Sequence, residues 1–161
     1  MNDLVPAATT AVAEIRFSLQ PTPPAAIEKV RALTAEHLKH PQVPFVTEHC
    51  LHAGMYTRTV LMPAGSEGTG ALVKAATMLF IQGDCEVYTG YETVRITGHA
   101  ALPAAPNRKQ AFHAYADTLV SMVFPSDAKS VAEAEAQFTD ELDGLWPLSD
   151  APRHQITITG D

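Results

Sequence analysis

Residues 62–90 read MPAGSEGTGALVKAATMLFIQGDCEVYTG, and residues 96–124 read ITGHAALPAAPNRKQAFHAYADTLVSMVF. In both stretches, short apolar or alternating segments are separated by turn residues such as Gly83-Asp84, Gly98 and Pro103. The segments PFVTEH and MYTRTVLM, which precede them, also have the period of two that is typical of strands. The sequence therefore predicts about eight short strands in an antiparallel sandwich or barrel, without helical crossovers.

Helical patterns flank this β region on both sides. Before it, apolar residues recur at three- and four-residue spacing, with Thr22 as a cap and Pro23 in the first turn. After it, Ser130 and Glu133 have the spacing of a capping box, and an acidic amphipathic helix is predicted to continue to Gly144. The fold class predicted from these patterns is mainly β, with an N-terminal helix and a C-terminal acidic helix.

One domain is expected, because 161 residues is close to the usual size of a single domain. Its predicted parts are residues 1–23, an N-terminal arm and Pro-rich hinge; residues 24–40, a helix packed on the barrel; residues 43–125, the β-barrel; and residues 126–161, the C-terminal helix with a short terminal strand at residues 154–159.

The formal net charge of −7 is unevenly distributed along the chain. Residues 1–125 carry 9 basic and 10 acidic side chains, whereas residues 126–150 carry one basic and seven acidic side chains. Because there is no basic stripe, a nucleic-acid partner is not expected. No long apolar run and no secretory leader is recognisable, so no membrane association is expected and the cytoplasm is the expected location. Cys50 and Cys85 lack zinc-type spacing and are expected to be reduced thiols.

The segments 62–90 and 96–124 resemble the two motifs of the cupin family, the small jelly-roll or double-stranded β-helix barrels. The whole chain is also similar to small cupin-like proteins of tailed bacteriophages and prophages, notably in HCLHAGMYTRTVLMPAG, RKQAF and FPSDAKSVAEAEAQFTDEL. These resemblances imply a single cupin-like jelly-roll barrel in the cytoplasm of a bacterial host or in a virion. They imply no particular activity, because cupins include enzymes and binding proteins alike.

The residues at the cupin ligand positions do not suit a metal. If Gly83 closes the first motif, the family's Glu position falls at Ala76, and its His-x-His pair falls at Gly70 and Leu72 or, one residue earlier, at Thr69 and Ala71. The second-motif His falls at Arg108 or Gln110, depending on how the motif is aligned. None of these residues is a normal metal ligand. The sequence therefore predicts no metal and no cofactor.

A basic ligand pocket inside the barrel is the functional interpretation of the polar residues in these strands. Lys74 shares a face with Gly70, Leu72 and Ala76, so it points inward if that face is inward. The candidate ligand-binding residues are Tyr56, Arg58, Lys74, Arg108, Gln110 and His113. The structural alternatives are that Lys74 reaches the barrel mouth or pairs with Asp84 or Glu86, and that Tyr56 and Arg58 pack outward against the N-terminal helix.

Other candidates are weaker. His49 and His52 are expected on opposite faces of a strand, which argues against a shared metal or nucleophile site. His113 and Tyr115 share one face, whereas an epimerase base and acid approach the substrate from opposite sides. The acidic face of residues 130–146 is either solvated or a docking face for a basic partner, and Trp146 is either a hydrophobic anchor or an exposed contact.

The leading functional hypothesis is a non-enzymatic phage or prophage protein that acts by self-association and by protein or small-ligand binding. A virion role, as head decoration or tail accessory, and an intracellular role are both compatible with it. The partners expected are further copies of the chain and a phage structural or host protein. The alternative is a metal-independent enzyme, isomerase-like or epimerase-like, that uses the basic barrel pocket.

Overall fold

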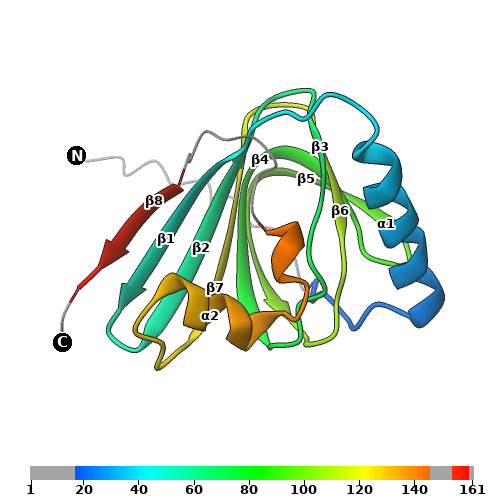
Figure 1. Cartoon of the computed structure of the whole chain (residues 1–161). Helices are drawn as coiled ribbons and strands as arrows, with labels where there is room; N and C mark the ends of the chain where they lie inside the picture. Colours follow the sequence, from blue (N-terminus) through cyan, green and yellow to red (C-terminus); the bar gives the residue numbers. More distant parts are fainter. Residues whose placement is uncertain (1–16, 146–153, 160–161) are drawn as a thin grey trace, which may run out of the picture.

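The computed structural model describes residues 17–145 and 154–159 of the chain (Figure 1). The elements in chain order are α1 (Pro24–His37), β1 (Val46–His52), β2 (Met55–Met62), β3 (Glu67–Thr69), β4 (Thr77–Tyr88), β5 (Thr93–Ala104), β6 (Ala111–Ala114), β7 (Thr118–Pro125), α2 (Val131–Phe138), the 3₁₀ turn η1 (Leu142–Gly144) and β8 (His154–Ile158). The predicted fold class is confirmed: the protein is mainly β, with one helix before the strands and one between β7 and β8.

The strands form one sheet that curls into a half-barrel (Figure 1). Its order is β3-β6-β4-β7-β2-β1-β8, and β5 pairs with β4 outside this path. All pairs are antiparallel except β1 with β8, which is parallel. None of the helices in the described residues has the length and apolar content needed to cross a bilayer.

The half-barrel bends where two glycines face each other. Gly83 of β4 pairs with Gly98 of β5, and both have positive φ angles, +147° and +84°. At this point the neighbour of β4 changes from β7, which pairs with residues 78–82, to β6, which pairs with residues 85–88. Gly83 and Gly98 were predicted to end strands, but the structure corrects this: both lie inside continuous strands. Because glycine tolerates positive φ, the two strands can bend together without being interrupted.

The concave face of the sheet carries the core. In β4 the residues that face it are the odd-numbered ones, whereas Lys74 was assigned to an even-numbered inward set. Odd-numbered residues of β4, such as Leu79 and Ile81, are buried inside, whereas Met78 and Phe80 lie on the outer face. The buried cluster contains Leu19, Leu51, Tyr56, Leu79, Ile81, Cys85, Val87, Ile96, Ala100, Leu102, Ala104, Met122, Phe124, Ala134 and Phe138. Residues 71–76, which were predicted to start this strand, lie before β4, and the one bridge among them joins Val73 to Arg108.

The two flanking helices differ in how closely they follow the sequence pattern. The N-terminal one is confirmed as α1, which buries Ala26 and Val30. Its N-cap is Pro23 rather than Thr22, whose hydroxyl donates to the Lys109 carbonyl oxygen instead. The C-terminal one ends at Phe138 instead of Gly144, because Thr139 is extended and its hydroxyl donates to the Leu72 carbonyl oxygen. Ser130 caps α2 as predicted, accepting from the Glu133 N–H. Residues 1–16 of the predicted arm and Trp146 lie outside the described residues.

Candidate functional site

Residues 131–145, here called the acidic plug, comprise α2, η1 and the connection between them. They lie across the concave side of the curled sheet (Figure 1), and Ala134 and Phe138 belong to the same buried cluster as Leu79 and Leu102. The plug therefore occupies the interior in which the sequence predicted a ligand pocket. The contacts of its carboxylates define three places where it is anchored.

The first anchor is a buried polar cluster beneath α2. Arg58 Nη1 donates to Glu135 Oε1 at 2.9 Å, and Arg58 Nη2 donates to the Leu145 carbonyl oxygen at 3.1 Å. The Glu135 side chain is only 2% exposed. Tyr56 lies beside Arg58, and its hydroxyl shares a hydrogen bond of 2.8 Å with His49 Nδ1. Burial raises the pKa of Tyr56 to about 12, although the Arg58 charge acts in the opposite direction.

Aromatic packing surrounds this cluster. Phe138 of the plug stacks on Tyr56, with ring centroids 6.2 Å apart, and meets Phe124 edge-on at 6.0 Å. Tyr56 and Phe124 also meet edge-on, at 5.5 Å. The three rings close the interior around the ion pair, so Arg58 and Glu135 interact in surroundings of low polarity where their attraction is strong.

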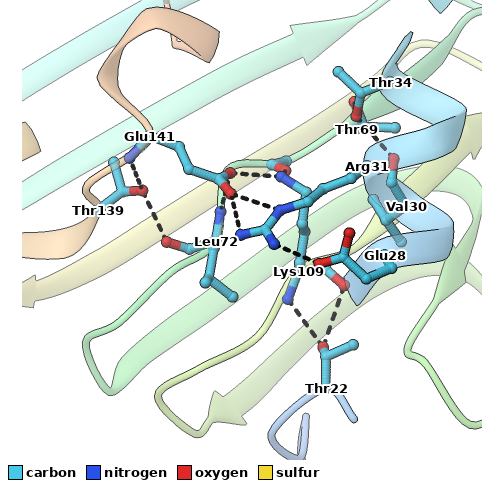
Figure 2. A network of polar contacts seen from close by, with 11 residues as sticks. Thr22, Glu28, Val30, Arg31, Thr34, Thr69, Leu72, Lys109, Thr139 and Glu141 are labelled. Carbon is cyan, nitrogen blue, oxygen red and sulfur yellow. Dashed lines mark hydrogen bonds and ion pairs between the residues drawn. The ribbon is translucent and has the colours of Figure 1, made fainter. Parts of the chain in front are cut away.

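The second anchor is Glu141, which joins three separate parts of the protein (Figure 2). Its Oε2 accepts from Lys109 Nζ at 2.6 Å and from the Leu72 N–H at 2.8 Å. Its Oε1 accepts from the Arg31 guanidinium of α1, with Nη2 at 3.0 Å. Lys109 also donates to the Gly70 carbonyl oxygen, and its backbone N–H donates to the Thr22 hydroxyl. One carboxylate of the plug thus ties α1 and the paired segments 70–73 and 108–110 together.

The third anchor involves Lys74. Its side chain is 40% exposed and forms an ion pair with Asp140 of the plug, while its backbone N–H donates to the Phe138 carbonyl oxygen. The structure therefore places Lys74 at the rim and pairs it with Asp140 rather than with Asp84 or Glu86. An exposed ion pair of this kind contributes little to stability, about 0–1 kcal/mol.

Arg108 and Gln110 lie on the segment just before β6. The Arg108 side chain is buried, and its guanidinium donates to the Thr77 hydroxyl and to the carbonyl oxygens of Ala75, Ala104 and Ala105. Its Nε has no hydrogen-bond partner, and no ion pair of Arg108 is found within the described ranges. Burial lowers the pKa of Arg108 to about 10. Gln110 is buried, and its backbone oxygen accepts from the Gly70 N–H.

His113 lies on the outer face of the sheet. Its Nδ1 is 3.3 Å from Glu67 Oε1, and its ring meets Tyr115 edge-on at 4.5 Å. The structure thus separates the six sequence-predicted residues into three groups. Tyr56 and Arg58 are together in the interior; Lys74, Arg108 and Gln110 are on the paired segments 70–75 and 108–110; and His113 is outside.

Sequence reasoning missed the acidic half of the site. Glu135 and Glu141 were predicted to lie on a solvated or docking helix face, yet they face Arg58 and Lys109. Their position in the only strongly acidic segment of the sequence was the available signal. His49 was expected on one face of a strand, without a part in a shared site, and the structure buries it beside Tyr56.

The charge of Glu141 makes the second anchor depend on pH. Burial would raise the pKa of this carboxyl, but the hydrogen bonds from Lys109, the Leu72 N–H and Arg31 outweigh burial and hold the pKa below its usual value. A carboxyl whose pKa is depressed by folding stabilises the protein above its unfolded pKa, about 4.3 for glutamate. That contribution is lost as the pH falls through the lowered pKa.

Glu141→Gln is therefore expected to reduce the free energy of unfolding by about 1 kcal/mol at pH 7. The difference from the wild type should shrink as the pH falls below about 4. Urea denaturation of both proteins at a series of pH values measures this. The Asp143→Asn variant, in the same segment, is the matched control, and a difference that stays constant down to pH 2 contradicts the assignment.

Neither a protein-family model nor a curated protein sequence matches this chain. Among similar solved structures is KdgF from a Halomonas species, with 20% identity over 57% of this chain and 91% of that one and a TM-score of 0.44. An RmlC-like cupin protein from Desulfovibrio desulfuricans has 18% identity over 55% and 91%, with a TM-score of 0.41. A cupin-superfamily protein from Desulfitobacterium hafniense has 10% identity over 69% and 100%, with a TM-score of 0.45.

Gly70, Leu72 and Ala76, which the resemblance assigned to ligand positions on a strand, lie before β4. The Arg108 guanidinium donates to the carbonyl oxygens of Ala75 and Ala105. Within the described residues, no group of three or more His, Cys, Asp and Glu side chains has the arrangement to hold a metal ion. The charged pair found in the interior is Arg58 with the Glu135 carboxylate.

Proposed function

We propose that this protein is a non-enzymatic, cupin-fold protein that acts by self-association and by binding a partner at the concave face of its half-barrel. The observation that carries the proposal is that the interior is filled by the plug, with Glu135 on Arg58 and Phe138 on Tyr56. A surface that receives an amphipathic helix through an ion pair and aromatic anchors has the composition of a protein-binding site.

The burial of the interior polar groups supports binding over turnover. Tyr56 and His49 could serve as acid and base, but both are almost fully buried under α2, and a substrate would have to displace the plug to reach them. Of the remaining candidate residues, Lys74 pairs with Asp140, the Arg108 guanidinium donates to Thr77 and to backbone oxygens, and His113 lies on the outer face. A basic catalytic pocket, as in the isomerase-like alternative, is thus not the arrangement that these contacts favour.

The similarity of the whole chain to small cupin-like proteins of tailed phages supports a phage or prophage role, either in the virion or inside the host cell. Peptide mass spectrometry of purified particles, induced from a strain that encodes the chain, separates the two locations. Recovery of the chain in stoichiometric amounts with the capsid or tail proteins places it in the virion.

Native mass spectrometry of the wild-type protein, purified without added metal, tests the central proposal. We expect an oligomer of the chain without a stoichiometric small molecule. The same spectrum in the presence of denaturing solvent is the control for tightly bound ligands, because it releases them. A monomer that retains one small molecule per chain contradicts the proposal and supports the metal-independent enzyme instead.

A further inference from the structure

We propose that residues 13–16, which lie outside the described residues and are here called the arm strand, pair with the outer edge of β5, the edge away from β4. Within the described residues, this edge carries a single bridge, between Leu19 and Ala104. The described chain begins at Phe17, beside this bridge, so the arm strand starts where the edge is still open. Unpaired backbone groups on such an edge are a template for a further strand. The proposal does not rest on the self-association proposed above.

The first described residues already have one face toward the core. Residues 13–19 read AEIRFSL, so apolar and polar residues alternate with a period of two. Leu19 is 1% exposed within the buried cluster and Phe17 packs against that cluster, whereas Ser18 is exposed. The odd-numbered residues therefore face inward, and the same alternation assigns Ile15 to the inner face.

The hydrogen bonds of Leu19 fix the register of the pairing. Its N–H donates to the Pro103 carbonyl oxygen at 2.9 Å, and its carbonyl oxygen accepts from the Ala105 N–H at 2.8 Å. This is the pattern of a parallel pair in which Leu19 lies opposite Ala104. Each step back along the arm strand is therefore matched by an equal step back along β5.

In this register both faces of the arm strand meet suitable residues of β5. On the inner face, Ile15 lies opposite Ala100, which is 4% exposed and has a side chain of one methyl group. On the outer face, Glu14 lies opposite His99, which is exposed and stacks on Phe80. A carboxylate can accept a hydrogen bond from this imidazole. The arm strand thus matches β5 in size on one face and in polarity on the other.

Pro103 accounts for the isolated form of the bridge at Leu19. In a parallel pair with this register, the carbonyl oxygen of Phe17 faces the backbone nitrogen of residue 103, and proline has no N–H to donate. One hydrogen bond is therefore missing from the ladder. The next donor on the same edge is the Ala101 N–H, which faces the carbonyl oxygen of Ile15, so the pairing resumes there.

A disulfide between Glu14→Cys and His99→Cys tests the register in the full chain. We expect it to form within one chain on mild oxidation, as detected by mass spectrometry of the non-reduced peptides. Glu14→Cys with Ala101→Cys is the matched control, because these positions are about 8 Å apart in the proposed register, beyond the reach of a disulfide. The wild type, oxidised in parallel, reports any disulfide of Cys50 and Cys85.

The other outcomes of this experiment overturn the proposal. A disulfide of the first pair that joins two chains assigns the β5 edge to the N-terminal segment of a second copy. Equal cross-linking of both pairs means that the segment has no fixed register on β5. Absence of a disulfide in both pairs means that it does not lie on this edge.

Hydrogen exchange of the Ala101 amide, followed by NMR in the full chain, tests the pairing without cysteines. We expect slow exchange in the wild type and exchange about tenfold or more faster in Ile15→Pro, because proline removes the donor that faces the His99 carbonyl oxygen. Arg16→Pro is the matched control: its backbone nitrogen points away from β5, so exchange at Ala101 should stay slow. Fast exchange in the wild type, or equal effects of the two prolines, contradicts the proposal.

Discussion

Replacement of Arg58 by methionine is expected to lower the free energy of unfolding by about 3–5 kcal/mol, the largest loss that any side chain of the interior should produce. The variant keeps most of the apolar volume of Arg58 but removes the guanidinium from Glu135, which is 2% exposed. It also leaves the Leu145 carbonyl oxygen without the donor Nη2. The buried carboxylate cannot recover its hydration in the folded state, so the penalty remains.

Guanidinium chloride denaturation at pH 7 measures the loss. The double variant Arg58→Met/Glu135→Leu should recover most of it, because both charges are then replaced by apolar groups. Lys74→Met is the matched control for loss of an exposed ion pair to the same plug and should change stability by less than about 1 kcal/mol. A loss at Arg58 as small as that at Lys74 contradicts the assignment of the interior pair as the main anchor.

Gly83→Ala is expected to destabilise the protein by about 3 kcal/mol or more. A Cβ atom at this position would lie 2.5 Å from Thr118 Oγ1 and 2.8 Å from the Asp117 carbonyl oxygen, and the φ angle of +147° is unfavourable for alanine. The obstructing atoms belong to the backbone and to the fully buried Thr118, so they cannot move aside at low cost. The corner between β6 and β7 would have to shift away from β4.

Gly98→Ala provides the matched control, because Gly98 faces Gly83 and has a φ angle of +84°, but no atom lies within 4 Å of its Cβ position. This variant should show only the backbone strain, about 1–2 kcal/mol. Thermal denaturation measures the loss of stability of each variant. The difference between the two losses gives the cost of the steric clash at Gly83, because backbone strain is common to both. Equal losses of stability would mean that the clash with Thr118 adds nothing to the cost of an alanine at position 83.

The period of two and the turn residues predicted the mainly β fold and the strands β2, β6 and β7 well. The same signals divided β4 and β5 too early, because a glycine within a bend and a glycine in a turn look alike in a sequence. Which residues of β4 face the interior could also not be predicted from the sequence. Residues 71–82 read as one run in the sequence, whereas the structure begins β4 at Thr77 and leaves Val73 in an isolated bridge.

The candidate site was half predictable. Tyr56 and Arg58 share a face with Val60 in any strand, so their pairing in space follows from the period alone. The acidic partner of Arg58 cannot be predicted from this period. Glu135 is 77 residues away in the sequence, and it lies beside Arg58 only because the chain turns back after Pro125. The end of α2 at Phe138 depends on the contact of Thr139 with Leu72, a tertiary interaction that overrides the helical pattern of residues 130–145.

The long hairpin of β4 and β5 has a kinetic consequence. Twelve residue pairs join these strands across a short connection, so this is the part of the sheet that closes with the smallest loss of chain entropy. The contacts between β2 and α2 close a far longer loop. Their stabilising energy is therefore gained only after the sheet has formed. Substitutions in the plug should therefore act mainly on the unfolding rate, and those at the bend of the hairpin on the rate of folding.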